Sequence, residues 1–185
     1  MMIFNKLWFI IFLPFSFLLQ GEDSICWTEQ VSLKCSDFMA IPDARNPNPA
    51  LTTYKMSISY HVNQDSISIE VKCYFKKLKS WMKDSCKASL LKHEQGHFNI
   101  AEIYTRKLRK MISEHKFDLA SLRRDLEYLN KNVSNDCGRE HQLYDKETNN
   151  SLNVIGQRQW EKQIADDLIK YQAFSNIHIE TKLEK

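Results

Sequence analysis

The amino-acid sequence predicts an α+β fold, in which a small antiparallel sheet packs on a long helix and two further helices. The first observation is an alternation of apolar and polar residues between positions 52 and 75, the period of strands with one buried face. The second is a switch after Cys86 to apolar residues at every third or fourth position, the period of a helix. Hydrophobic residues make up 43% of the chain and aromatic residues 11%, enough to build a core.

Residues 52–62 and 67–75 are the two predicted strands. The apolar side of the second strand consists of Ile67, Ile69, Val71, Cys73 and Phe75. The four residues between the strands, 63–66, are the turn formers Asn-Gln-Asp-Ser. A short polar connection of this kind predicts an antiparallel hairpin.

A long helix is predicted over residues 85–114. Its inward stripe consists of Leu90, Glu94, His97, Ala101, Tyr104, Leu108 and Met111. Asp84 or Ser85 can cap its start, and no proline interrupts it. Gly96 costs about 1 kcal/mol in a helix interior relative to alanine. We therefore expect a close approach of another backbone or of a substrate at this position.

Two further helices are predicted, over residues 118–132 and 152–173. The first has leucines at heptad-like spacing, and the second has an apolar stripe that includes Trp160, Ile164 and Leu168. Residues 132–140 interrupt the helical pattern, and the sequence Asn-Asp-Cys-Gly within them is interpreted as a turn. The last ten residues are polar and are expected to fray.

The amino-terminal stretch differs from the rest of the chain. Lys6 is followed by an apolar run of 13 residues, shorter than the roughly 20 that a membrane-spanning helix requires. Residues 1–21 are therefore predicted to be a signal peptide, and residues 22–185 a single domain. The mature protein is expected to be exported, periplasmic or extracellular, with no stable membrane span. The alternative is an anchor formed by an uncleaved amino-terminal segment.

The net charge bears on the kind of partner that the protein binds, and the cysteine content bears on disulfide formation. The net charge of +3, with no aromatic-basic recognition motif, argues against a nucleic-acid partner. An exported protein with five cysteines can form up to two disulfides. Their pairing is left open by the sequence, and the cysteines are Cys26, Cys35, Cys73, Cys86 and Cys137.

The motif H-E-x-x-H lies at His93, Glu94 and His97, within the predicted long helix. Two histidines four residues apart on a helix project from nearly the same face and can hold one Zn²⁺. The glutamate beside the first histidine can act as general base on a water held by the metal. The alternative is that these histidines are hydrogen-bonded core residues without a metal.

A zinc site of this kind requires a third protein ligand. Glu102 lies five residues beyond His97 and points about 140° away on the helix, so we interpret it as a surface partner of Arg106. The third ligand is therefore expected from a later element. The candidates are Asp145, His141 and Glu147.

Residues 90–98, followed by Glu102 and Arg106, resemble the core of a bacterial domain-of-unknown-function family, numbered 922, of predicted secreted zinc-dependent proteases. The likeness covers most of the mature chain and includes Asp37-Phe38, the strand pair running into Phe75, Ser80-Trp81, Tyr144-Asp145-x-x-Thr148 and Gln157-x-x-Trp160. The resemblance implies a zincin-like domain with His93 and His97 as ligands and Glu94 as catalytic acid/base.

The sequence departs from the family pattern after Thr148. The family usually continues Thr-x-His-Gly, whereas this chain has Asn149-Asn150-Ser151. If the missing histidine is the family's third ligand, Asn150 replaces it, and either metal affinity falls steeply or a neighbouring residue substitutes. If Asp145 or another group is the ligand, the change is harmless.

The function that these observations favour is a secreted zinc metallopeptidase, a hydrolase acting on a peptide or protein substrate. Glu94 would activate the water, and Tyr144 is a candidate for stabilising the oxyanion. The alternative is a non-catalytic exported binding or structural protein of the same fold that has lost full metal coordination.

Overall fold

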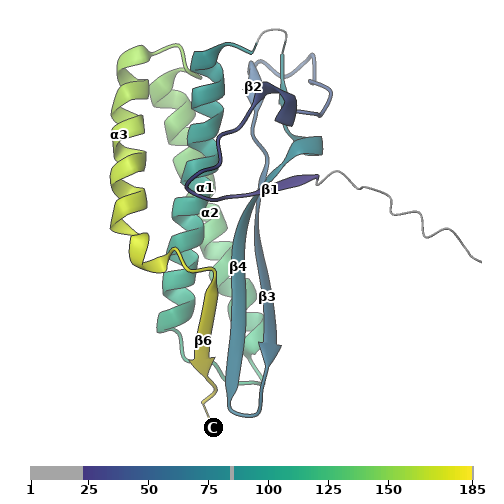
Figure 1. Cartoon of the computed structure of the whole chain (residues 1–185), viewed down its shortest axis with the longest axis vertical. Coiled ribbons are helices and arrows are strands. Elements are labelled where there is room, and N and C mark those ends of the chain that lie inside the picture. Colours follow the sequence, from purple (N-terminus) through teal and green to yellow (C-terminus); the bar gives the residue numbers. More distant parts are fainter. Residues whose placement is uncertain (1–22, 84–85, 185) are drawn as a thin grey trace, which may run out of the picture.

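The computed structural model describes residues 23–83 and 86–184. It has three long helices packed beside an antiparallel sheet, which confirms the predicted α+β class (Figure 1). The predicted signal peptide and the two predicted capping residues, Asp84 and Ser85, lie outside the described residues.

The predicted hairpin is present and forms the centre of the sheet. Strand β3 (Tyr54–Val62) pairs with β4 (Ser66–Lys76) along its whole length, with Met56 opposite Cys73. The other edge of β4 carries two short strands in succession, β1 (Ser24–Cys26) and β6 (His178–Lys182). The inward side chains of β4 are at most 1% exposed, because this strand lies between neighbours and beneath a helix.

Helix α1 (Ala88–Glu114) is 27 residues long and is the central helix of the protein. It contacts β4, α2, α3 and β6, so residues on nearly all of its sides are buried. Its apolar residues Ile100, Leu108 and Ile112 join the face of β4 in one core. The long-helix prediction is confirmed, and the neighbouring elements bury most side chains in the middle of α1.

The predicted interruption at residues 132–140 is wrong. Helix α2 (Leu122–Thr148) runs through this stretch without a break and is 27 residues long. Val133, Cys137 and Tyr144 continue its buried stripe against α1. Tertiary packing thus outweighs the weak helix preference of Asn135, Asp136 and Gly138, which lie away from this stripe.

The carboxyl-terminal part differs from the prediction in one respect. Helix α3 (Val154–Lys170) and the short 3₁₀ turn η3 (Gln172–Phe174) together account for the predicted third helix. The last residues, expected to fray, instead form β6 against β4. Ile179 is the residue of β6 that enters the core, and a single inward apolar residue is a weak strand signal.

A second, two-stranded sheet lies near the start of α1. It pairs β2 (Ala50–Leu51) with β5 (Trp81–Met82), and two 3₁₀ turns, η1 (Cys35–Asp37) and η2 (Lys77–Lys79), flank it. A disulfide joins Cys35 to Cys86, two residues before α1 begins. The other three cysteines, all in described segments, are free thiols.

The disulfide fits an exported protein, because such bonds persist in oxidising compartments. Within residues 23–83 and 86–184, no helix combines the length and the apolar character that crossing a bilayer requires.

Glu102 and Arg106 form the expected pair, but they are buried rather than on the surface. Glu102, Arg106 and Arg109 are each at most 2% exposed, because α3 and η3 cover this side of α1. The Glu102 carboxylate accepts hydrogen bonds from Arg106 Nε at 3.1 Å and from Arg109 Nη1 at 2.8 Å. One buried carboxylate therefore holds two buried guanidinium groups.

Substitution Glu102→Ala is expected to destabilise the protein by about 3–5 kcal/mol, because two buried cations lose their shared partner. Urea unfolding followed by circular dichroism measures this loss. The matched control is Glu127→Ala, which removes an exposed carboxylate from its pair with Arg123 on α2. An equal loss in the two variants would contradict the structural role of the buried cluster.

Candidate metal centre

The H-E-x-x-H motif forms a cluster on the second and third turns of α1. Potential ligand atoms of His93, Glu94 and His97 all lie within 4.8 Å of one another, a grouping that could hold a metal ion. His93 and Glu94 are almost fully buried, and His97 is 9% exposed. The helical spacing brings the two imidazoles together, with ring centroids 4.8 Å apart.

Asp145 of α2 completes this cluster from across the helix interface. Its Oδ1 lies 3.1 Å from His93 Nε2 and 2.9 Å from His97 Nε2, so one carboxylate oxygen meets both imidazoles. Burial raises the pKa of this carboxyl group, but hydrogen bonding to His93 and His97 outweighs burial and holds the pKa below its ordinary value. Asp145 is therefore ionised and supplies a negative charge to the centre.

A chain of hydrogen bonds fixes which nitrogen of His93 carries the proton. The Tyr144 hydroxyl donates to the backbone carbonyl of His93 at 3.1 Å, so its oxygen is free to accept from Gln157 Nε2 at 2.9 Å. The amide oxygen of Gln157 then faces His93 Nδ1 at 3.1 Å and must accept. When His93 is neutral, it therefore carries its proton on Nδ1, and the lone pair of Nε2 points toward Asp145.

This tautomer has a direct electrostatic consequence. With neutral His93, the Nε2 lone pair and the Asp145 oxygen are two acceptors facing each other at 3.1 Å. Such a contact is repulsive unless a cation lies between the two atoms. That cation can be a proton, which makes the imidazole an imidazolium, or a metal ion that both atoms coordinate.

His97 is supported by a second series of side chains. Its Nδ1 lies 2.9 Å from His141 Nδ1, and His141 Nε2 lies 3.4 Å from the Cys137 sulfur. Burial, together with the neighbouring His97, lowers the pKa of His141 to about 3, so its ring is neutral. Burial also raises the pKa of the Cys137 thiol to about 12. His97 therefore contacts a neutral, buried chain of groups on α2.

Glu94 faces a cavity of about 160 Å³ beside the imidazoles. The hydroxyl of Thr52 donates to Glu94 Oε2 at 2.7 Å and holds the carboxylate toward this cavity. Other residues that line the cavity are Asn48, Ala50, Leu51, Tyr54, His97, His141, Asp145 and Asn150. The cavity is thus bounded by α1, by α2 and by the segment around β2.

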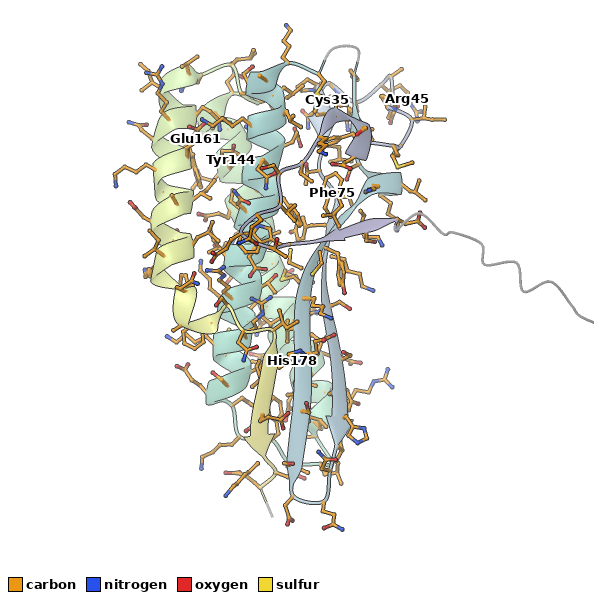
Figure 2. The ribbon with its side chains drawn as sticks, in the orientation of Figure 1. Cys35, Arg45, Phe75, Tyr144, Glu161 and His178 are labelled. Atoms are coloured by element: carbon orange, nitrogen blue, oxygen red, sulfur yellow. A yellow bond between two sulfur atoms is a disulfide. The ribbon has the colours of Figure 1, made fainter. Side chains whose placement is uncertain are left out.

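Gly96 leaves room for Tyr144. A Cβ atom built on Gly96 would lie 2.3 Å from the Tyr144 hydroxyl oxygen and 2.8 Å from Cζ. The tyrosine ring also stacks on His93 with centroids 4.4 Å apart and packs against Trp160 of α3. Tyr144 thereby lies among the three helices (Figure 2). The close approach at Gly96 is therefore that of a side chain of α2, and not of the backbone or substrate that we expected.

The structure separates the candidates for the third ligand. Asp145 lies at the point where the two Nε2 atoms converge, whereas His141 contacts the opposite nitrogen of His97. Glu147 accepts a hydrogen bond from Trp160 Nε1 at 2.7 Å, away from this point. Asn150 lines the cavity but makes no hydrogen bond to His93 or His97 through its side chain.

Tyr144, the candidate oxyanion stabiliser, is fully buried, and its hydroxyl is engaged in two hydrogen bonds. It faces the back of His93 rather than the cavity that Glu94 lines. The position of Tyr144 therefore supports a role in holding His93 in place, and it argues against contact with a reacting group.

Three residues of the site were not singled out from the sequence for these roles: Thr52, Gln157 and Cys137. Gln157 lies three residues before Trp160, so the helical period places it on the inward face of α3. Cys137, His141 and Asp145 share a four-residue spacing that marks one face of a helix, but the expected turn at 135–138 concealed it. Thr52 carries no such signal, because its contact with Glu94 depends on how β2 packs.

Comparison with known proteins identifies the family. The model of a family described as a bacterial protein of unknown function (DUF922) matches residues 37–151, well over half of the chain. The chain belongs to this family. The matched range contains the cluster on α1 and Asp145, and it ends after the residues that replace the expected His-Gly. No curated protein and no solved structure matches the chain.

The backbone after α2 adopts the left-handed region at three consecutive residues. Asn149, Asn150 and Ser151 all have positive φ angles, of 46°, 47° and 75°. Glycine adopts this left-handed region without steric cost, whereas Ser151 adopts it with a side chain present. Asparagine tolerates the region better than most other residues, so Asn149 and Asn150 suit the turn.

Gly96→Ala is expected to destabilise the protein by about 1–3 kcal/mol, because the new methyl group collides with Tyr144. The higher helix propensity of alanine works in the opposite direction and offsets about 1 kcal/mol at most. Gly138→Ala is the matched control on α2, where a Cβ meets nothing within 4 Å, and it is expected to be stabilising. Thermal unfolding of both variants tests this, and stabilisation by Gly96→Ala would contradict the packing described.

Proposed function

We propose that this protein is a zinc-dependent peptidase whose metal ligands are His93, His97 and Asp145. The observation that carries the proposal is the convergence of two imidazole Nε2 atoms on one carboxylate oxygen, at 3.1 and 2.9 Å. The hydrogen bond from His93 Nδ1 to Gln157 supports it, because metal-bound histidines almost always donate their second ring nitrogen to a protein acceptor.

The donor set fits zinc better than magnesium or calcium. Two imidazole nitrogens and one carboxylate oxygen match the three-ligand pattern of catalytic zinc sites, whereas the alkaline-earth ions prefer sets made of oxygens. The single negative charge of Asp145 leaves a net positive centre once a divalent cation binds. That charge lies beside Glu94 and the cavity that Thr52 and the β2 segment line.

Bound zinc would supply Lewis acidity, both for activating a water and for polarising a carbonyl. Glu94 receives the proton of the attacking water and later returns a proton to the leaving amine. The Thr52 hydroxyl keeps the Glu94 carboxylate turned toward the cavity, at 2.7 Å from Oε2. His93 is held by Tyr144 and Gln157, so its lone pair keeps one direction throughout.

The substrate we propose is a peptide or protein, and the compartment is outside the cytoplasm. The disulfide between Cys35 and Cys86 supports an oxidising compartment. The position of Asp145 supports three intact ligands despite the departure at Asn150, which we take to be tolerated. Residues 1–21 are proposed to be a cleaved signal peptide and the remainder a single domain.

A non-catalytic role is the second candidate, and one observation favours it. The same three side chains form a closed hydrogen-bonded group without metal if His93 is protonated, since Asp145 is then its counterion. Metal content distinguishes the two candidates. We expect about one zinc per chain after purification and incubation with zinc, whereas a protein that takes up none would favour the binding or structural role.

Glu94→Gln is expected to lower peptide hydrolysis by at least about 10²–10⁴-fold, because the amide cannot accept the proton of the water. Zinc content is expected to stay at the wild-type level, since Glu94 is not among the proposed ligands. Hydrolysis of a denatured protein substrate and elemental analysis measure the two quantities. Wild-type hydrolysis by this variant would rule out the mechanism.

Asp145→Asn is expected to lower zinc affinity by more than the roughly 10–100-fold that loss of an outer hydrogen-bonding partner costs. Competition with a chromogenic chelator measures the affinity without any need for activity. Glu147→Gln is the matched control on the same helix, because its carboxylate faces Trp160. Equal zinc affinity in wild type and Asp145→Asn would show that the third ligand lies elsewhere.

A further inference from the structure

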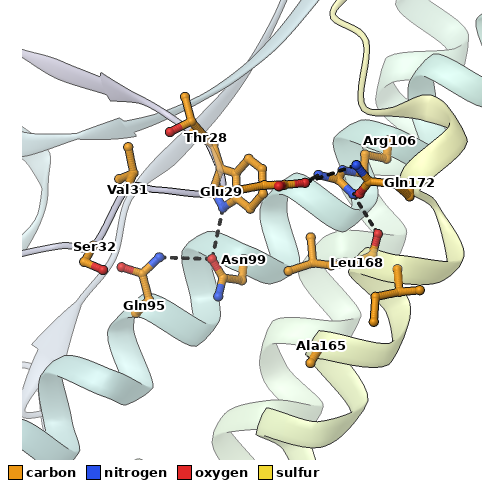
Figure 3. Close-up of a pocket in the computed structure, with 12 residues that line it drawn as sticks. Thr28, Glu29, Val31, Ser32, Gln95, Asn99, Arg106, Ala165, Leu168 and Gln172 are labelled. Atoms are coloured by element: carbon orange, nitrogen blue, oxygen red, sulfur yellow. Dashed lines mark hydrogen bonds and ion pairs between the residues drawn. The ribbon is translucent and has the colours of Figure 1, made fainter.

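A second pocket lies on the opposite side of α1 from the metal centre. Its volume is about 600 Å³, within the usual range for small-molecule sites, and it lies between the segment after β1, α1 and α3. Gln95 and Asn99 of α1 line it, each two residues beyond a motif histidine and therefore about 200° round the helix. Figure 3 shows the pocket with Glu29 reaching across it toward Arg106.

The pocket contains a buried guanidinium group whose hydrogen bonds are incomplete. Arg106 Nε donates to Glu102, and Nη1 donates to the carbonyl of Leu168 and to Gln172. Among the described residues, Nη2 makes no hydrogen bond, and its one ionic contact is with Glu29 Oε1 at 3.7 Å. Arg106 is nevertheless 1% exposed, so a strong donor is held at the wall of the pocket with a distant partner.

The charges around Arg106 do not balance within the core. Arg106 and Arg109 carry two positive charges and share the single negative charge of Glu102. The remaining positive charge faces Glu29, whose side chain is 56% exposed. Because an uncompensated buried charge is costly, this position favours an anion.

Glu29 itself indicates which anion fits. Its Oε1 accepts a hydrogen bond from Gln172 Nε2 at 3.1 Å while it faces Arg106 Nη2. Two donors from α1 and η3 therefore converge on one carboxylate oxygen that comes from an exposed side chain. A carboxylate from solution can take the same position when Glu29 turns outward, at a distance short enough for a full hydrogen bond to Nη2.

The other residues that line the pocket indicate what kind of chemical group the carboxylate of the ligand is attached to. Ala165, Leu168 and Ile169 of α3 form an apolar wall, and Ile169 is 73% exposed. The Trp27 indole donates to Asn99 at the opposite wall. An aliphatic group attached to the carboxylate would cover the exposed apolar surface and gain its burial.

We propose that this pocket binds a carboxylate carried on an aliphatic body, with Arg106 Nη2 and Gln172 Nε2 as its donors and Glu29 as the group that it displaces. A small carboxylic acid and the carboxyl terminus of a peptide share this chemistry. The site is separate from the metal centre, so the proposal does not depend on the peptidase function.

The test follows the indole N–H resonance of Trp27 by NMR while N-acetyl-leucine is added to the protein. We expect this resonance to shift and saturate, and we expect the neutral N-acetyl-leucinamide to leave it unchanged. Assignment of the resonance comes from its loss in Trp27→Phe. No shift with N-acetyl-leucine at tens of millimolar, or an equal shift with the amide, would overturn the proposal.

Two variants sharpen this test. Glu29→Gln removes the competing charge and keeps an acceptor oxygen, so N-acetyl-leucine should bind about two- to fivefold more tightly, as expected for an exposed ion pair. Glu127→Gln is the matched control, because it removes an equal charge from an exposed pair on α2. If the Glu29→Gln variant binds N-acetyl-leucine with unchanged affinity, the proposal that the ligand displaces the Glu29 side chain is overturned.

Ala165→Trp fills the pocket from α3 without touching the buried ion pairs, and it should abolish the shift. Retained binding in a folded Ala165→Trp protein would contradict this pocket as the site.

A hexapeptide ending in leucine, compared with its carboxyl-terminal amide, distinguishes the two sources of the carboxylate. Tighter binding than N-acetyl-leucine supports a peptide terminus, and weaker binding supports a small acid.

Discussion

The buried hydroxyl of Tyr144 is the contact on which the geometry of the candidate metal centre depends. It joins a backbone carbonyl of α1 to the amide of Gln157 on α3, while the tyrosine itself belongs to α2. Because a carbonyl only accepts, the direction of every bond in this chain is fixed, and the orientation of the His93 lone pair follows from it. The missing side chain of Gly96 is what allows the hydroxyl to come this close.

The parts of the fold that the sequence predicted are those where local period and burial agree. The hairpin of β3 and β4 and the helix α1 each bury a long, regular stripe, so alternation or helical spacing identifies them. The turn expected at residues 135–138 was wrong because packing on α1 decides that stretch, and local preference does not. Strand β6 has a single buried residue, Ile179, and forms because β4 offers it a free edge.

The residues of the candidate site likewise divide into those that a local sequence pattern places together and those whose position depends on tertiary packing. His93 and His97 lie one helical turn apart with Glu94 beside the first, and their spacing alone places them together. The choice among Asp145, His141 and Glu147 depends on how α2 is rotated against α1, which no local pattern specifies. The burial of Glu102 and Arg106 also escaped sequence reasoning, because it results from the packing of α3 and η3 over this side of α1.

The unbroken course of α2 limits where this chain could gain or lose residues without disturbing the candidate site. Each residue of an α-helix advances the side chains by about 100°, so one inserted or deleted residue between Leu122 and Asp145 would turn the carboxylate away from both imidazoles. The same rotation would turn the buried stripe of α2 beyond the change, which includes Cys137 and Tyr144, away from α1. Length differences compatible with the site are therefore confined to the connections before and after α2, where they leave the phase of the helix unchanged.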